Sequence, residues 1–208
     1  MTEQNNFSVA DASISDSRPM TSPEQNSFDL NRAAVIVAAC VVAFALRLVQ
    51  LPIANFGCLL ALSLFCGSLT RHRAAVLIPL AVRVLSDLTI HYKTGYGFFP
   101  SWPFDYGAYV LVFALGTWIR PNQATRIACG SVTSVALYFV LSNLGCWWIW
   151  PETYEHSVTG LLACYENAIP FVRGTLWGNL LMTAVFFSAW RLVSGTQPAV
   201  RPEPSGVR

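Results

Sequence analysis

Two opposite charges stand four residues apart inside an apolar segment. Arg83 and Asp87 occur in the run PLAVRVLSD, and this spacing places both side chains on one face of a helix. A charge deep in a bilayer costs from a few to more than about ten kcal/mol, so such groups face the bundle interior and pair. The two residues predict either a structural ion pair, with Ser86 as a further partner, or a group that binds a ligand or handles a proton.

Arg47 is a candidate third member of this group. It lies near the end of the first apolar run, on the same predicted side of the membrane as Asp87. The alternative interpretation is that its long side chain reaches out to the membrane interface.

A second set of titratable residues lies in the stretch PETYEHSVTGLLACYENAIP, with Glu152, Glu155, His156 and Glu166. The spacing E-x-x-E-H matches no metal motif, and the chain has no HExxH, GxSxG or Walker A pattern. We therefore expect no metal, no cofactor and no enzymatic activity. An enzyme built on Asp87, Glu166 or His156 would need these groups within hydrogen-bond reach in a cleft.

The composition predicts the class of protein that positions these residues. Of the 208 residues, 54% are hydrophobic and 12% are charged, against about 25% charged in a typical soluble domain. A soluble fold would expose large apolar patches, whereas a lipid bilayer accommodates them. The net charge of +2 gives no nucleic-acid signature. We expect an all-α, polytopic membrane bundle whose first partner is the bilayer.

Six apolar segments predict six transmembrane helices, at about residues 33–49, 53–69, 74–90, 104–119, 127–144 and 171–193. Several of them, the second and fourth included, are shorter than the ~20 residues that span a bilayer comfortably. The polar stretch 1–31 and the Pro-rich stretch 195–208 predict disordered tails on either side of a transmembrane domain at 32–194.

Basic residues predict the orientation, because Lys and Arg accumulate on the cytoplasmic side. With both termini inside, nine of the thirteen Lys and Arg fall on the inner side: Arg18, Arg32, Arg71, Arg73, Arg120, Arg126, Arg191, Arg201 and Arg208. We therefore expect a multi-pass protein of the inner (cytoplasmic) membrane with both ends in the cytoplasm.

The longer loops, which this orientation places outside, are rich in aromatic residues. They form either an interfacial aromatic belt or a cover over a small-molecule pocket. The inner side holds little beyond Trp118 and Trp190, which argues against a plain belt. The candidate ligand-binding residues are Arg47, Asn55, Arg83, Asp87, Trp102, Asn143, Tyr165 and Glu166.

The last outer loop predicts a short helix at the interface. Residues 157–168 read as helical, with Thr153 or Ser157 as a cap, and Pro170 is expected to end the helix before the last span. Cys146 and Cys164 would lie on this side, where a disulfide between them would form only if that side is oxidising.

Small residues repeat at a spacing of four in the first two segments. The first holds the pairs Ala34/Ala38 and Ala39/Ala43, and the second holds Gly57/Ala61 and Ser63/Gly67. Such residues let membrane helices approach closely. They predict either packing inside the bundle or docking to a partner membrane protein.

Four stretches resemble a family of small bacterial membrane proteins of unknown function. They are R-x₄-P-x₂-NFG from Arg47, ALSLFCGS from Ala61, PLAVRVLSD, and GLLACYENAIPFVRGTLWGN from Gly160. The resemblance covers about residues 44–190. The family motif commonly ends in Gly-Asp, where this chain has Gly178-Asn179.

That family is in turn similar to the substrate-binding S components of energy-coupling factor vitamin transporters. The resemblance implies six helices, both termini inside, a ligand under the outer loops, and docking to a transporter subunit through an Ala-rich first helix. A solute-binding transporter component is thus the first hypothesis. A membrane structural or assembly protein that acts through partner helices is the second, and an enzyme is the third.

Overall fold

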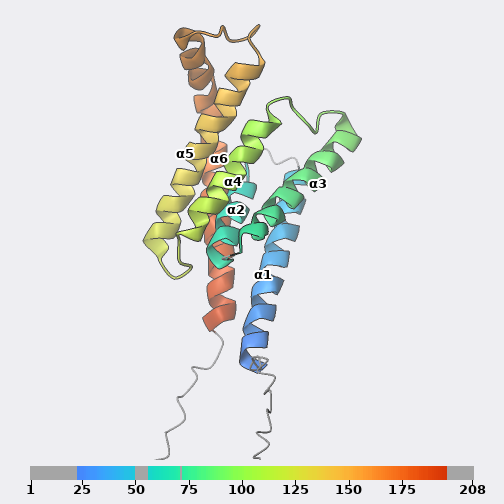
Figure 1. Ribbon diagram of the computed structural model, residues 1–208, viewed down its shortest axis with the longest axis vertical. Helices are drawn as coiled ribbons and strands as arrows, with labels where there is room; N and C mark the ends of the chain where they lie inside the picture. Colours follow the sequence, from blue (N-terminus) through green and yellow to red (C-terminus); the bar gives the residue numbers. More distant parts are fainter. Residues whose placement is uncertain (1–22, 50–55, 71, 196–208) are drawn as a thin grey trace, which may run out of the picture.

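The computed structural model describes residues 23–49, 56–70 and 72–195, with side chains from residue 26 onward. In these residues the fold is all helical, as predicted, with six α-helices and one short 3-10 helix. They are α1 (Pro23–Leu48), α2 (Leu59–Leu69), η1 (Arg73–Val76), α3 (Leu77–Thr94), α4 (Trp102–Thr117), α5 (Ala124–Ile149) and α6 (Val158–Gly195). Figure 1 shows them as an elongated bundle, with the start of α1 and the end of α6 at the same end.

Four of these helices are long and apolar enough to cross a membrane: Asn26–Leu48, Arg73–Thr94, Ala124–Ile149 and Val158–Gly195. Large apolar side chains such as Val37, Val41, Leu85 and Leu181 are exposed on their outer faces, which suits contact with lipid rather than water. The apolar helices indicate a multi-pass membrane protein.

The second predicted span is much shorter than expected. α2 begins at Leu59 instead of residue 53, and its 11 residues rise about 16 Å, roughly half the hydrocarbon thickness. Residues 50–55 lie outside the described part of the chain. All but Ser68 of α2 are buried, as expected of a helix that is apolar all round. α2 is therefore a central core element.

Close backbone contact with α4 holds α2 in place. A Cβ atom on Gly67 would meet the carbonyl of Phe113, and one on Gly116 would meet the carbonyl of Leu64. The small residues of α2 thus serve packing within the bundle, one of the two predicted roles.

α1 begins ten residues before the predicted span, at Pro23, so the predicted tail at 1–31 is too long. Proline suits the first turn of a helix because its missing N–H would be unpaired there anyway. Phe28 then packs edge-on against Trp190 near the end of α6, with ring centroids 5.4 Å apart. The rest of the tails predicted at 1–31 and 195–208, namely residues 1–22 and 196–208, lies outside the described residues.

The predicted break at Pro170 is wrong. α6 begins at Val158 and continues through Pro170 as one helix of 38 residues, so residues 158–168 are its first turns and not a separate interfacial helix. Proline removes one helical hydrogen bond, and membrane helices tolerate this loss because neighbouring groups satisfy the freed backbone. The predicted cap at Ser157 is present, since its hydroxyl accepts a hydrogen bond from the Gly160 N–H at 3.1 Å.

Candidate functional site

A buried charge cluster joins α1, α3 and α4. Arg83 Nε donates to Asp87 Oδ2 at 2.6 Å, and Arg47 Nη2 donates to Asp87 Oδ1 at 2.5 Å. The spacing of four inside α3 therefore produces the predicted ion pair, and Arg47 joins it from the end of α1. Asp87 is 1% exposed and Arg83 is 7% exposed. Both oxygens of the buried carboxylate are thus paired with a cation, as burial of a charge requires.

α4 supplies the rest of the cluster. The Tyr106 hydroxyl donates to Asp87 Oδ2 at 3.0 Å, and the Tyr109 hydroxyl accepts from Arg83 Nη1 at 2.9 Å. Arg83 Nη2 lies 3.8 Å from Asp105 Oδ2. The guanidinium of Arg83 also stands 5.6 Å from the ring centre of Tyr106 and 5.4 Å from that of Tyr109, within cation–π range.

A cavity of about 470 Å³ opens beside this cluster. Its wall comes from the end of α1, the start of α2, α3, α4, α5 and the part of α6 around Pro170. The wall is mostly apolar, with Leu46, Leu59, Leu60, Val135, Phe139, Phe171 and Val172 among its residues. The volume and the apolar lining are those of a small-molecule pocket.

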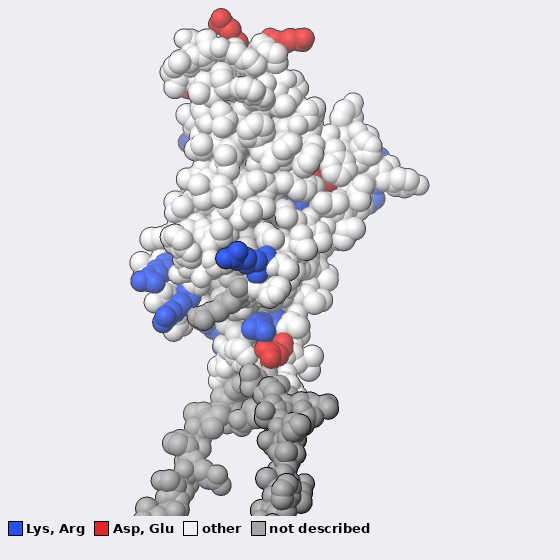
Figure 2. Space-filling view, viewed as in Figure 1, with Lys and Arg blue, Asp and Glu red and all other residues white. Residues whose placement is uncertain are grey.

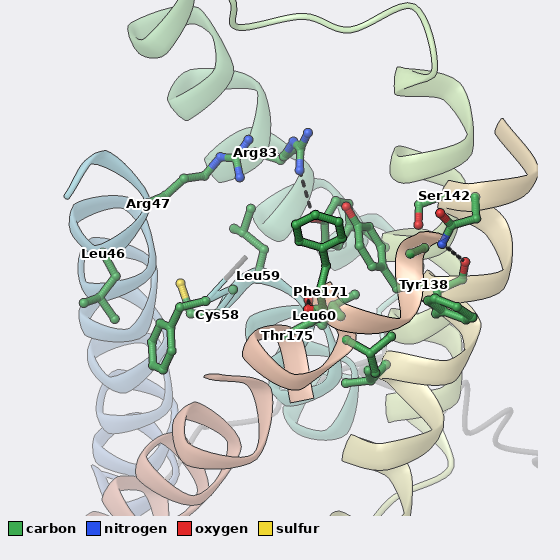
Figure 3. A pocket seen from close by; sticks show the side chains of 18 of the residues that line it. Leu46, Arg47, Cys58, Leu59, Leu60, Arg83, Tyr138, Ser142, Phe171 and Thr175 are labelled. Atoms are coloured by element: carbon green, nitrogen blue, oxygen red, sulfur yellow. Dashed lines mark hydrogen bonds between the residues drawn. The ribbon is translucent and has the colours of Figure 1, made fainter. Parts of the chain in front are cut away.

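A few polar groups interrupt the apolar wall. Figure 3 shows the guanidinium groups of Arg47 and Arg83 at one edge of the cavity, with Tyr138 and Ser142 toward the opposite side. Asp87 and Asp105, the carboxylate partners of these arginines, do not belong to the wall. The cavity therefore meets the positive side of the cluster.

The Arg47 side chain lines the cavity and is 26% exposed. Its Nε atom is buried and has no hydrogen-bond partner.

The predicted ligand-binding residues divide into three sets. Arg47, Arg83 and Asn143 line the cavity, whereas Asp87 lies behind the two arginines. Trp102, Tyr165 and Glu166 do not line it: Trp102 packs edge-on against Tyr106, Tyr165 donates to the Val140 carbonyl at 2.8 Å, and Glu166 is exposed on α6. Asn55 lies outside the described residues.

Sequence reasoning missed the contribution of α4. Asp105, Tyr106 and Tyr109 occur in one helical turn of an otherwise apolar segment, and that pattern of polar groups was the available signal. Asp105 lies at the beginning of the predicted span 104–119, where a charge is ordinary, so its sequence position alone does not indicate a buried site. Cys58 was missed as well: it lines the cavity, and its thiol donates to the Ala43 carbonyl at 3.4 Å.

A separate polar group lies deeper in the bundle. Asn179 of α6 is fully buried, and its Nδ2 donates to the carbonyl and the hydroxyl of Ser131 at 2.8 and 2.9 Å. Ser131 in turn shares a hydrogen bond of 3.1 Å with Thr183. This group connects α5 to α6, in the manner of polar residues that join membrane helices.

The acidic loop between α5 and α6 forms no metal cluster with its histidine. His156 stacks on Trp148, and its Nε2 lies 3.1 and 3.2 Å from the carbonyls of Trp147 and Trp148. Among the described residues no three His, Cys, Asp or Glu side chains gather as metal ligands would. Asp87, Glu166 and His156 each have different surroundings, and no described hydrogen bond joins any two of them.

Cys146 and Cys164 are both free thiols. The Cys164 thiol donates to the Asn143 carbonyl at 3.4 Å, which helps to pack the start of α6 against α5.

Comparison with known proteins gives a family without a function. A search of curated proteins and a search of solved structures found no match. A family model covers residues 28–200, which include all the described helices from the first turns of α1 onward. The chain therefore belongs to the family of unknown function DUF6580.

Proposed function

We propose that this protein binds a small solute in the cavity between its helices and serves as the substrate-binding component of a transporter. The observation that supports this proposal most is the cavity of about 470 Å³, whose largely apolar wall includes the side chains of two arginines, Arg47 and Arg83. Convergent polar groups in a largely apolar cavity are typical of a ligand site.

The proposal includes a six-span inner-membrane topology with both ends in the cytoplasm. α2 and α4 would complete the count as short helices within the bundle. On the face in Figure 2, Lys and Arg gather near the end that carries the start of α1 and the end of α6. The opposite end, at the turn between α5 and α6, holds the exposed acids Glu152 and Glu155. This distribution agrees with the positive-inside rule.

With that orientation the cavity lies in the outer half of the protein. Its wall uses the late residues of α1 and α5 and the early residues of α2 and α6, which are the parts away from the basic end. A pocket in the outer half agrees with the resemblance to the S components of energy-coupling factor transporters, and this likeness motivates the transport part of the proposal.

Docking to a transporter subunit would involve only some of the α1 alanines. Ala34 and Ala38 are exposed, whereas Ala39 and Ala43 are buried in the core. The predicted docking set therefore reduces to Ala34 and Ala38. The same exposed pair supports the second candidate function, an assembly protein that acts through partner helices and needs no ligand.

Ligand binding separates the two candidates. The purified protein would be screened by thermal shift against small metabolites, because a specific ligand stabilises the folded state by mass action. Ser142→Phe fills the cavity, and Thr133→Phe on the exposed face of the same helix is the matched control. A solute-binding protein loses the ligand-induced shift in Ser142→Phe alone. Absence of any shift in the parent protein would favour the assembly role.

A further inference from the structure

We infer that the cavity selects an anion: a molecule with a carboxylate or phosphate-type group on an apolar body. This inference rests on the proposed function and adds the chemical class of the ligand. It rests on the charges that line the cavity, on the hydrogen bonds that the two arginines already make, and on the apolar character of the remaining wall.

The charges of the cluster are unevenly placed around the cavity. The cluster contains two arginines and two aspartates, but only the arginines, Arg47 and Arg83, line the cavity. Asp87 is 1% exposed and holds both arginines from behind. A cation in the cavity would face two guanidinium groups with no carboxylate on the wall. An anion would face the same groups favourably, in surroundings of low dielectric constant where the interaction is strong.

The two arginines differ in how firmly the protein holds their guanidinium groups. Arg83 donates from Nε to Asp87 and from Nη1 to Tyr109, and its Nη2 lies at ion-pair distance, 3.8 Å, from Asp105, so its guanidinium is held firmly. Arg47 uses Nη2 for Asp87, while its Nε is buried without a partner. Because Nε is closed off by protein atoms, an acid group would reach the exposed part of this guanidinium and accept a charge-assisted hydrogen bond there. Arg47 is therefore the residue that receives the acid group, and Arg83 supplies a fixed second positive charge.

The rest of the cavity wall combines one tyrosine hydroxyl with apolar side chains. The hydroxyl of Tyr109 accepts from Arg83, so its own proton is free to point toward an acceptor. Beyond these donors the wall is largely apolar, with Leu60, Val135 and Phe171 among its residues. Burial against such a wall is favourable for an apolar body and not for a second charged group. The ligand is thus an amphipathic anion.

The anion could come from two sources, a free solute or the acid headgroup of a membrane lipid, and the experiment separates them. The protein is placed in nanodiscs of neutral phosphatidylcholine and its melting temperature is measured with a library balanced among monoanions, monocations and neutral compounds. A second series uses nanodiscs that contain anionic phosphatidylglycerol. Stabilisation by soluble monoanions indicates a solute, and stabilisation by phosphatidylglycerol alone indicates a lipid.

Variants of Arg47 test the receiving group. Arg47→Lys keeps a positive charge opposite Asp87 but lacks the guanidinium fork that can hold Asp87 and an acid group at once, so the fold is retained while the affinity for the anion falls. We expect about a tenfold or larger rise in Kd, as for loss of a hydrogen bond to a charged group. Arg47→Gln should lose at least as much. Arg32→Gln is the control, because Arg32 lies on the same helix and pairs with the exposed Asp29.

The outcomes distinguish this inference from the proposed function. If the compounds that stabilise the parent but not Ser142→Phe are cations or neutral molecules, the anion inference is overturned while ligand binding stands. An unchanged Kd in Arg47→Lys overturns it as well. If neither the library nor phosphatidylglycerol stabilises the parent protein, the proposed function fails and the inference fails with it.

Discussion

Arg47 and Asp87 lie forty residues apart in the chain, yet their side chains meet at 2.5 Å between Nη2 and Oδ1. The contact ties the end of α1 to the middle of α3. Asp87 also accepts from Arg83 of its own helix and from Tyr106 of α4. One buried carboxylate therefore joins three helices beside the cavity, and it fixes the two arginines that line the cavity wall.

The stability of the bundle should depend strongly on Asp87. Asp87→Asn leaves Arg83 buried and Arg47 partly buried without their shared counter-charge, and breaking a buried pair in this way costs about 3–5 kcal/mol. Unfolding in mixed detergent micelles measures the loss. Asp29→Asn breaks the exposed pair with Arg32 and should change little, as surface pairs do. Equal losses in the two variants would contradict the central role of Asp87.

The hydroxyl of Tyr106 should make a smaller contribution. Tyr106→Phe removes the hydrogen bond to Asp87 and leaves the ring beside Arg83 and Trp102. We expect a loss of about 0.5–1.5 kcal/mol, the range for hydrogen bonds between membrane helices. Tyr92→Phe is the control, since Tyr92 is 93% exposed. If Tyr106→Phe has the same free energy of unfolding as the parent protein, the two arginines alone satisfy the hydrogen bonds of Asp87.

The crossing of α2 and α4 predicts a contrast between two glycines. Gly67→Ala would drive a methyl group into the Phe113 carbonyl, so one helix must move, and strain of this kind costs about 1–3 kcal/mol. Gly107→Ala, on α4, meets no atom within 4 Å and should be neutral or stabilising by up to about 1 kcal/mol, because alanine favours a helix. Thermal unfolding of both variants compares them directly. If Gly67→Ala is as stable as Gly107→Ala, the close crossing does not exist.

The charged residues illustrate what a sequence can predict. Arg83 and Asp87 were predicted to pair because helical periodicity and the cost of buried charge leave few alternatives. Arg47 was a reasonable third member because it ends an apolar run on the same side. The partners on α4 were not predicted, since nothing in a single sequence indicates which helix packs against α3.

The ends of the helices, by contrast, are poorly predicted from the sequence. Hydropathy gives the existence of a helix, but α2 is only 11 residues long, and its length depends on contacts with α4 and α6 that the sequence does not reveal. The local preference of proline predicts a helix end at Pro170. The surrounding bundle overrides that preference and α6 runs through it.

The proposed orientation can be checked with one cysteine on each side. Glu152→Cys lies in the exposed turn between α5 and α6, and Asn122→Cys lies in the exposed turn between α4 and α5. In intact cells stripped of their outer membrane, an impermeant maleimide should label Glu152→Cys, and it should label Asn122→Cys only after the cells are opened. The parent chain gives the background from the six native cysteines. Labelling in the reverse order would invert the topology and move the cavity to the inner half.

Asn179 supports a prediction about the polar contact between α5 and α6. Its Nδ2 donates twice to Ser131, while its Oδ1 is buried without a partner. Asn179→Leu removes both donations and the unpaired oxygen together, so the loss should be modest, about 1 kcal/mol. Asn179→Asp keeps the size but places carboxylate oxygens against the Ser131 carbonyl, and loss of the donor in a buried site should cost more, about 2–4 kcal/mol.

The order of the two Asn179 variants is therefore the test, measured by unfolding in the same micelles. Asn167→Asp, on the exposed part of the same helix, is the control for the added charge; it gives up only a surface contact of 3.4 Å with the Tyr154 hydroxyl and should lose much less stability than Asn179→Asp. The test is informative because the resembling family commonly has aspartate after this glycine. If Asn179→Asp is the more stable of the two variants, the Ser131 and Thr183 hydroxyls must turn to donate to the carboxylate. The amide would then be one of two equivalent solutions and not the source of the contact.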